Sequence, residues 1–127
     1  MGEALVREVK KKILVIDDES PIAEMIAEFC VSFGYEAKVT TTSENVLQTV
    51  KDYQPDLITL DLLMPEISGL EVMEELREDQ ITRNIPIIII SSLAGTPVAD
   101  QIERSELVLS KPIRMSHLEG VLSEVLA

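Results

Sequence analysis

Reactive polar side chains stand at or just after the ends of four apolar segments of this 127-residue chain. They are Asp17, Asp18, Asp61, Ser91 and Lys111, and the apolar segments are 12–16, 57–60, 87–90 and 107–109. Carboxylates suit a hard divalent cation, and a carboxylate can also attack phosphorus. Hydroxyl and ammonium groups bind the oxygens of a phosphoryl group. These side chains form a reactive site only if the fold brings them together.

Short apolar segments that alternate with amphipathic stretches predict a parallel sheet covered by helices on both faces. The carboxyl ends of parallel strands share one edge of the sheet, where ligands bind in such folds. We therefore expect the five polar side chains to converge. The expected strands are 12–17, an edge strand at 36–40, 56–61, 85–90 and 107–109. The expected helices are 20–33, 43–53, one after Ser68, a short one from Thr96 and one after Ser116.

Local signals set several helix boundaries and inner faces. Ser20-Pro21 suits a helix start, and Gly34 suits its end. Ser68 and Ser116 are each followed three residues later by glutamate, the spacing of a capping box. The inner faces are expected to carry Leu70, Met73 and Leu76 on the helix after Ser68, and Leu118, Val121, Leu122 and Val125 on the last helix. With five strand–helix units, this predicts an α/β fold of the doubly wound, flavodoxin-like (βα)5 type, with strand order 2-1-3-4-5.

Composition limits the classes of function. The net charge of −12 argues against nucleic-acid binding, which depends on Lys and Arg, and aromatic residues make up only 3% of the chain. The single cysteine, Cys30, is expected to be a core thiol. No apolar stretch approaches the roughly 20 residues of a membrane span, so we expect a cytoplasmic protein with no membrane insertion. Residues 1–10 are interpreted as a leader and 11–127 as one domain.

Convergence of three carboxylates has an energetic consequence. At about 5 Å, each pair repels by roughly 3 kcal/mol with an effective dielectric constant near 20. A divalent cation offsets this repulsion, and Mg²⁺ (or Mn²⁺) suits a site made of carboxylates, water and phosphate.

The same residues carry a resemblance to a known family. The chain resembles the receiver domain of response regulators in two-component systems. The resemblance rests on Asp17-Asp18, the segment 61–69 (Asp-Leu-Leu-Met-Pro-Glu-Ile-Ser-Gly), Ser91 after Pro-Ile-Ile-Ile-Ile, and Lys111-Pro112. It spans the chain from about Lys11 to the C-terminus.

The resemblance implies roles for these residues. Asp61 is the expected phosphoacceptor, and Lys111 and Ser91 are expected to contact the phosphoryl group. The implied metal ligands are Asp18, Asp61 and the backbone carbonyl of Leu63, with Asp17 acting mainly through water. The phosphoryl donor is a sensor histidine kinase or a histidine phosphotransfer protein, and the signal passes on by conformational change or onward phosphotransfer, with a phosphorylation-linked homodimer as one form of output. Such a domain modifies itself and turns over no external substrate, so it is not an enzyme in the usual sense.

Two alternatives remain open at this point. The family usually has an aromatic residue where this chain has Val108, which points to a degenerate receiver that acts only as an interaction module, whereas the intact acidic cluster and Lys111 count against that alternative. An enzyme on the same fold is the other alternative. A haloacid-dehalogenase-type phosphatase needs Asp-x-Asp rather than Asp17-Asp18, and a nucleotide or flavin binder needs a glycine-rich first turn that segment 18–21 lacks.

Overall fold

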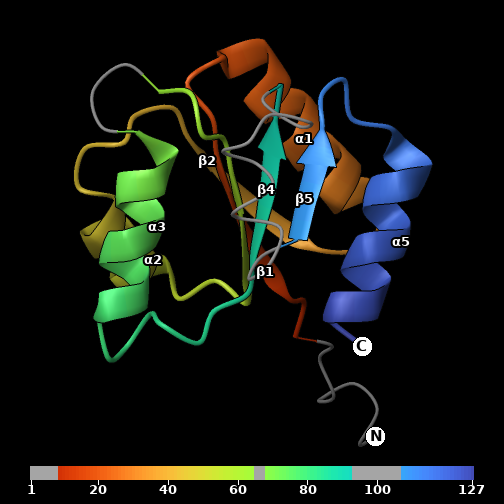
Figure 1. The fold of residues 1–127 in the computed structure, drawn as a ribbon. Coiled ribbons are helices and arrows are strands. Elements are labelled where there is room, and N and C mark those ends of the chain that lie inside the picture. Colours follow the sequence, from red (N-terminus) through yellow and green to blue (C-terminus); the bar gives the residue numbers. More distant parts are fainter. Residues whose placement is uncertain (1–8, 65–67, 93–106) are drawn as a thin grey trace, which may run out of the picture.

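The computed structural model describes residues 9–64, 68–92 and 107–127. Five strands form one parallel sheet in the order β2-β1-β3-β4-β5 (Figure 1). The strands are β1 (Lys12–Ile16), β2 (Glu36–Thr40), β3 (Leu57–Leu60), β4 (Ile87–Ser91) and β5 (Leu107–Ser110). The predicted strand order, and β2 at an edge of the sheet, are confirmed.

Four helices in the described residues cover the two faces of the sheet. They are α1 (Ser20–Ser32), α2 (Val46–Tyr53), α3 (Gly69–Glu78) and α5 (Met115–Val125). Helices α1 and α5 lie on one face, and α2 and α3 lie on the other (Figure 1). This is the flavodoxin-like α/β fold that the sequence predicts. None of the helices in the described ranges has the length and apolar character needed to cross a bilayer.

The inner strands β1, β3 and β4 are almost entirely apolar because helices cover both faces of the sheet. All four residues of β3 and all five of β4 are buried. Side chains that alternate along each strand divide into two core clusters, one under α1 and α5 and one under α2 and α3. Cys30 lies in the first cluster, where burial raises the pKa of its thiol to about 12, so the prediction of a core thiol is confirmed.

Helix ends differ from the predictions in two places. Helix α2 begins at Val46 rather than Ser43, because Asn45 has a left-handed backbone (φ 58°) that interrupts the helical path. Helix α5 begins at Met115 and its N-cap is Arg114, so Ser116 lies inside the first turn and the predicted capping box is wrong. The box at Ser68 is confirmed, since the Ser68 hydroxyl accepts a hydrogen bond from the Glu71 backbone N–H.

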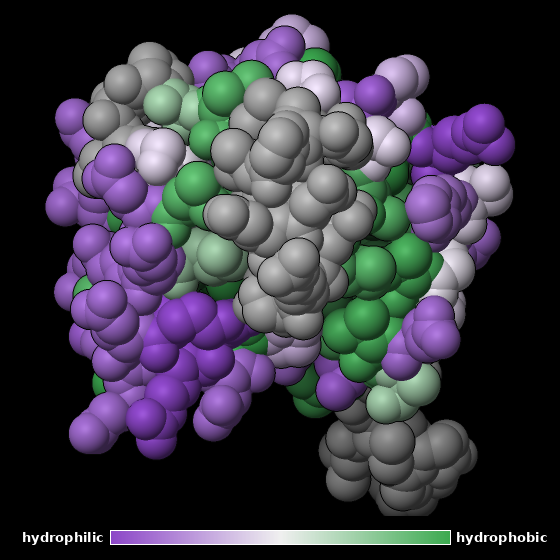
Figure 2. Space-filling model, viewed as in Figure 1, coloured by the Kyte–Doolittle hydropathy of each residue, from purple (hydrophilic) through white to green (hydrophobic). Residues whose placement is uncertain are grey.

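The inner helix faces are also slightly different. Leu118, Val121 and Leu122 are buried as predicted, but Val125 is 38% exposed near the end of α5, so its inward placement is wrong. In α3 the fully enclosed apolar residues are Val72 and Leu76. The helix predicted from Thr96 lies outside the described residues. Figure 2 shows hydrophobic surface on the β5 and α5 side of the molecule and mainly hydrophilic surface over α2 and α3.

Candidate functional site at the carboxyl ends of the strands

Three of the predicted site residues occupy equivalent positions in the sheet. Asp17, Asp61 and Lys111 are each the first residue after a strand, and each backbone N–H donates to the last residue of a neighbouring strand. These bonds join Asp17 N to Thr40 O (3.2 Å), Asp61 N to Ile16 O (2.9 Å) and Lys111 N to Ser91 O (3.2 Å). The sheet ladder therefore holds the backbone of all three residues at one edge, where the sequence predicts them to meet.

The Lys111 ammonium lies among three carboxylates. Its Nζ is 2.9 Å from Oδ2 of Asp17 and 3.4 Å from Oδ2 of Asp61. A third carboxylate, that of Glu19, lies 3.1 Å from the same nitrogen and accepts a hydrogen bond from it. The site thus holds three negative groups around one positive group.

Asp61 is held in a setting that disfavours its charge. The residue is only 3% exposed, and burial raises the pKa of its carboxyl above the ordinary value of 3.8. The backbone N–H of Leu63 donates to Asp61 Oδ1 (3.3 Å) and lowers that pKa, whereas the nearby Asp17 raises it and Lys111 lowers it. Burial has the largest effect on this pKa. A further cation near Asp61 would therefore stabilise the charged form of its carboxyl.

The surroundings of Lys111 favour its charged form. Burial alone lowers the pKa of its ammonium, but its close contacts with the carboxylates of Asp17 and Glu19 and the charge of Asp61 raise that pKa above the ordinary value of 10.5. Lys111 is therefore fully charged at neutral pH and supplies a permanent positive charge to the site.

The two carboxylate oxygens of Asp17 have different partners. Oδ1 accepts a hydrogen bond from the Glu19 backbone N–H at 2.9 Å, which shapes the turn into α1. Oδ2 is buried and forms the ion pair with Lys111, but that approach does not have hydrogen-bond geometry. A buried carboxylate oxygen that has an ion pair but no hydrogen bond can also bind a metal-bound water or a second cation.

Gly69 fixes the loop that carries Asp61. A Cβ at this position would lie 2.2 Å from the Asp61 backbone oxygen and 2.6 Å from Leu62 Cα, which is closer than real atoms approach. The Gly69 N–H donates to the Leu62 carbonyl at 3.0 Å. Glycine at this position therefore lets the first turn of α3 pack directly against the backbone of the predicted phosphoacceptor.

The carboxylates fit a small divalent cation. One oxygen each from Asp17, Glu19 and Asp61 lie within 4.8 Å of one another. Oxygen ligands in such a group are those that Mg²⁺ prefers. Asp18 is half-buried in the bend before α1 and does not belong to this group of the described residues, and Leu63 is 52% exposed after Asp61. Their roles as metal ligands stay predictions.

Ser91 lies at the same edge. It ends β4, is fully buried, and pairs in register with Ser110 of β5, next to Lys111. Its carbonyl accepts the Lys111 backbone N–H. The structure therefore brings together Asp17, Asp61, Ser91 and Lys111.

Glu19 is the site residue that the sequence analysis did not identify. It is the N-cap residue of α1, and its side chain is 56% exposed. The available signal was the acidic run at 17–19, in which Glu19 directly follows the two predicted residues. Since the turn geometry decides which of the three reaches Lys111, sequence spacing alone does not single out Glu19.

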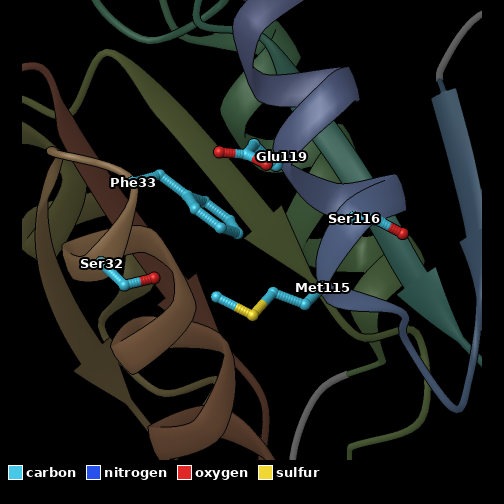
Figure 3. A pocket seen from close by; sticks show the side chains of 5 residues that line it. All are labelled: Ser32, Phe33, Met115, Ser116 and Glu119. Carbon is cyan, nitrogen blue, oxygen red and sulfur yellow. The ribbon is translucent and has the colours of Figure 1, made fainter.

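A separate hollow lies between the end of α1 and the start of α5. It has a volume of about 540 Å³ and is lined by Ser32, Phe33, Met115, Ser116 and Glu119. The Met115 side chain points from α5 toward α1, and the Phe33 ring faces the same space (Figure 3). Glu119 is the only ionisable side chain among these lining residues. The cluster of ionisable side chains that could react together therefore lies at the carboxyl ends of the strands.

Comparison with known proteins agrees with this geometry. Residues 13–123 match the sequence model of the response regulator receiver domain. The polar-differentiation response regulator DivK of Brucella ovis is 30% identical over 105 residues, which are 81% of this chain and 85% of DivK. The phosphate regulon transcriptional regulatory protein PhoB of Pseudomonas aeruginosa is 40% identical over 84 residues, which are 66% of this chain but only 37% of PhoB.

A solved structure shows the same fold. The receiver domain of the sensor histidine kinase PA1611 from Pseudomonas aeruginosa superimposes with a TM-score of 0.83 at 20% identity, over 94% of this chain and all of the other. That structure is described as having a magnesium ion coordinated in its active site cleft.

Proposed function

The chain belongs to the response regulator receiver family, and from this membership we propose that Asp61 accepts a phosphoryl group from a phosphohistidine donor. The observation that carries the proposal is the meeting of Asp61 with Lys111 and Asp17 at one edge of the sheet. Receiver domains are signalling modules that act with histidine kinases or phosphotransfer proteins, and they do not turn over an external substrate.

In the proposed step, an oxygen of the Asp61 carboxylate attacks phosphorus and forms an acyl phosphate. The P–N bond of the donor breaks, and its electron pair stays on the imidazole nitrogen, which takes up a proton. Asp61 suits this role because the Leu63 N–H binds Oδ1 and leaves Oδ2, on the Lys111 side, to form the new bond. Positioning of this kind accounts for most of the catalysis in phosphoryl transfer.

Lys111 and Ser91 would then hold the product. The new phosphoryl group carries roughly −1.5 to −2 units of charge, in place of the single charge of the carboxylate, next to an ammonium that is already present. The Ser91 hydroxyl, at the end of β4, would donate to a phosphoryl oxygen, and this contact would connect phosphorylation to movement of the β4 end.

A divalent cation fits the same site. Asp17, Asp18 and Asp61, with the Leu63 carbonyl, would hold Mg²⁺ or Mn²⁺. When bound, the cation supplies positive charge that offsets the charge of the transferring oxygens. The buried Asp17 Oδ2, which lacks a hydrogen bond, supports this assignment.

The remaining assignments follow from the family. We take residues 11–127 as the receiver domain and 1–10 as a leader, and we expect the exchange to take place in the cytoplasm with a histidine kinase or phosphotransfer protein. A homodimer linked to phosphorylation is one form that the output would take. A module that works without phosphorylation is not favoured, because such a module has no need for a buried carboxylate beside a lysine.

Intact-protein mass spectrometry tests the proposal. The full chain, incubated with acetyl phosphate and Mg²⁺, is expected to gain one phosphoryl group. Asp61→Asn is expected to abolish that gain. A wild-type chain that stays unmodified with both acetyl phosphate and a phosphohistidine donor would overturn the proposal.

Asp56→Asn is the matched control. Asp56 precedes β3 as Asp61 follows it, and its carboxylate accepts the Lys12 backbone N–H at 2.8 Å, a bond that an amide oxygen also accepts. This variant is expected to take up phosphoryl as the wild type does.

A further inference from the structure

We infer that Glu19 is a positioning residue that draws the Lys111 ammonium toward the rim of the site, so that Asp17 and Asp61 keep oxygens available for a divalent cation. This inference rests on the function proposed above. It concerns the residue that prepares the site rather than the residue that reacts.

The first support is the set of contacts around Lys111 Nζ. Glu19 Oε1 accepts a hydrogen bond from this nitrogen at 3.1 Å, and Asp17 Oδ2 lies 2.9 Å from it as an ion-pair partner. The distance to Asp61 Oδ2 is longer, 3.4 Å. Glu19 therefore competes with the proposed phosphoacceptor for the same ammonium.

The second support is the difference in burial. Side chains of Asp17 and Asp61 are 2% and 3% exposed, whereas that of Glu19 is 56% exposed. Contact with Glu19 thus places Lys111 between the buried carboxylates and solvent. The buried side chains of Asp17 and Asp61 have little room to move, whereas the exposed Glu19 side chain can move outward together with the Lys111 ammonium.

The Glu19 backbone is held while its side chain is exposed. Its N–H donates to Asp17 Oδ1 at 2.9 Å, and its carbonyl accepts the Ala23 N–H at 2.9 Å in the first turn of α1. The main chain therefore fixes the point from which the side chain extends. A carboxylate on this anchor stays within reach of Lys111 when the ammonium moves.

Charge balance explains why such a residue is useful. Lys111 Nζ lies among the same three carboxylates whose oxygens are suitably spaced for a cation. The ammonium and a divalent cation therefore compete for Asp17 and Asp61. By retaining the ammonium at its own carboxylate, Glu19 lowers the cost of moving Lys111 away when the cation binds.

The test measures Mg²⁺ affinity directly on the full chain. Titrating MgCl₂ while recording backbone amide chemical shifts by NMR gives a dissociation constant without any phosphoryl donor. Glu19→Gln is expected to raise that constant roughly two- to fivefold, the range that exposed ion pairs contribute. Glu24→Gln, which removes the same charge from an exposed position of the same helix, is expected to leave the constant unchanged.

A double-mutant cycle shows whether Glu19 acts through Lys111. In a Lys111→Met background, Glu19→Gln is expected to have no effect on the Mg²⁺ dissociation constant. An equal rise in both backgrounds, an equal rise in Glu24→Gln, or no rise in Glu19→Gln would each overturn the inference.

The same samples separate this inference from the proposed function. If the wild type gains a phosphoryl group on Asp61 but Glu19→Gln binds Mg²⁺ normally, only the role of Glu19 is refuted. If the wild type gains no phosphoryl group, the proposed function is refuted as well.

Discussion

The sheet carries a charged cluster at each end, and the two clusters are built differently. At the carboxyl ends of the strands, the carboxyl-end cluster consists of Asp17, Glu19, Asp61 and Lys111. At the amino ends, the amino-end cluster consists of Lys12, Glu36, Tyr53 and Asp56. Strands β1 and β3 run between the two clusters.

Each group in the amino-end cluster has a matched partner. The Lys12 N–H donates to Asp56 Oδ2 at 2.8 Å, and the Tyr53 hydroxyl donates to Glu36 Oε2 at 2.8 Å. The Lys12 ammonium donates to the Tyr53 carbonyl at 3.2 Å and lies 5.1 Å from the centre of its ring. These contacts join α2 to the edge of the sheet, and nothing in them calls for a ligand.

The carboxyl-end cluster has more negative charge than its single lysine can balance. Two of its carboxylates are almost completely buried, and burial raises the pKa of Asp61. A folded protein keeps such an arrangement at a cost in stability, which is typical of functional sites. The number of charges in a cluster therefore matters less than whether each charge already has its partner.

The largest expected effect comes from disturbing the backbone of the carboxyl-end cluster. Gly69→Ala places a methyl group into the backbone of Asp61 and Leu62, and we expect it to lower the free energy of unfolding by about 2–4 kcal/mol, because backbone atoms must move. Urea unfolding followed by circular dichroism measures this.

Gly120→Ala is the control for that substitution. A Cβ on Gly120, in α5, meets no atom within 4 Å. This variant is expected to be up to about 1 kcal/mol more stable than the wild type, because alanine favours a helix over glycine. Equal losses in the two variants would contradict the role assigned to Gly69.

Removing one charge from the carboxyl-end cluster should stabilise the fold. With Mg²⁺ removed by a chelator at pH 7, Asp61→Asn is expected to raise the free energy of unfolding by about 1 kcal/mol, since an amide avoids the burial of a charge and the repulsion by Asp17. Asp56→Asn, in the amino-end cluster, should give no gain. Thermal unfolding compares the two, and a loss of stability in Asp61→Asn would contradict the contrast between the clusters.

The same carboxyl predicts a pH dependence of stability. A raised pKa in the folded state means that Asp61 favours folding when protonated, fully so below 3.8, and that this contribution is lost as the pH rises through the folded pKa. The stability advantage of Asp61→Asn over the wild type should therefore shrink as the pH falls from 7 toward 4. Urea unfolding of both proteins at several pH values checks the sign.

The smallest effect is expected in the amino-end cluster. Tyr53→Phe removes the hydrogen bond to Glu36 at the molecular surface and should cost about 0.5–1 kcal/mol of stability. Phosphoryl uptake from acetyl phosphate should be unchanged, because the cluster lies at the opposite end of the strands. A slower uptake would show that the two ends are coupled.

Sequence patterns predict most of this fold for a simple reason. Apolar strand segments such as 87–90 have few alternative environments, and the carboxyl-end rule for parallel sheets then places Asp17, Asp61 and Lys111 together. Helix boundaries depend on single backbone conformations, so the left-handed Asn45 and the extended Arg114 shift α2 and α5 from their predicted starts. The sequence did not predict Glu19 as a site residue, because its contact with Lys111 depends on the direction in which the turn at 17–19 points its side chain.

The backbone hydrogen bonds that tie Asp17, Asp61 and Lys111 to neighbouring strands have a consequence for sequence change. Because side chains alternate between the faces of a strand, inserting a single residue within β1 or β3 would redirect the acid that follows to the opposite side. Lengthening a connecting helix by a whole turn would leave the acids where they are. Insertions in the connections are therefore compatible with the site, whereas an insertion of one residue in β1 or β3 is not.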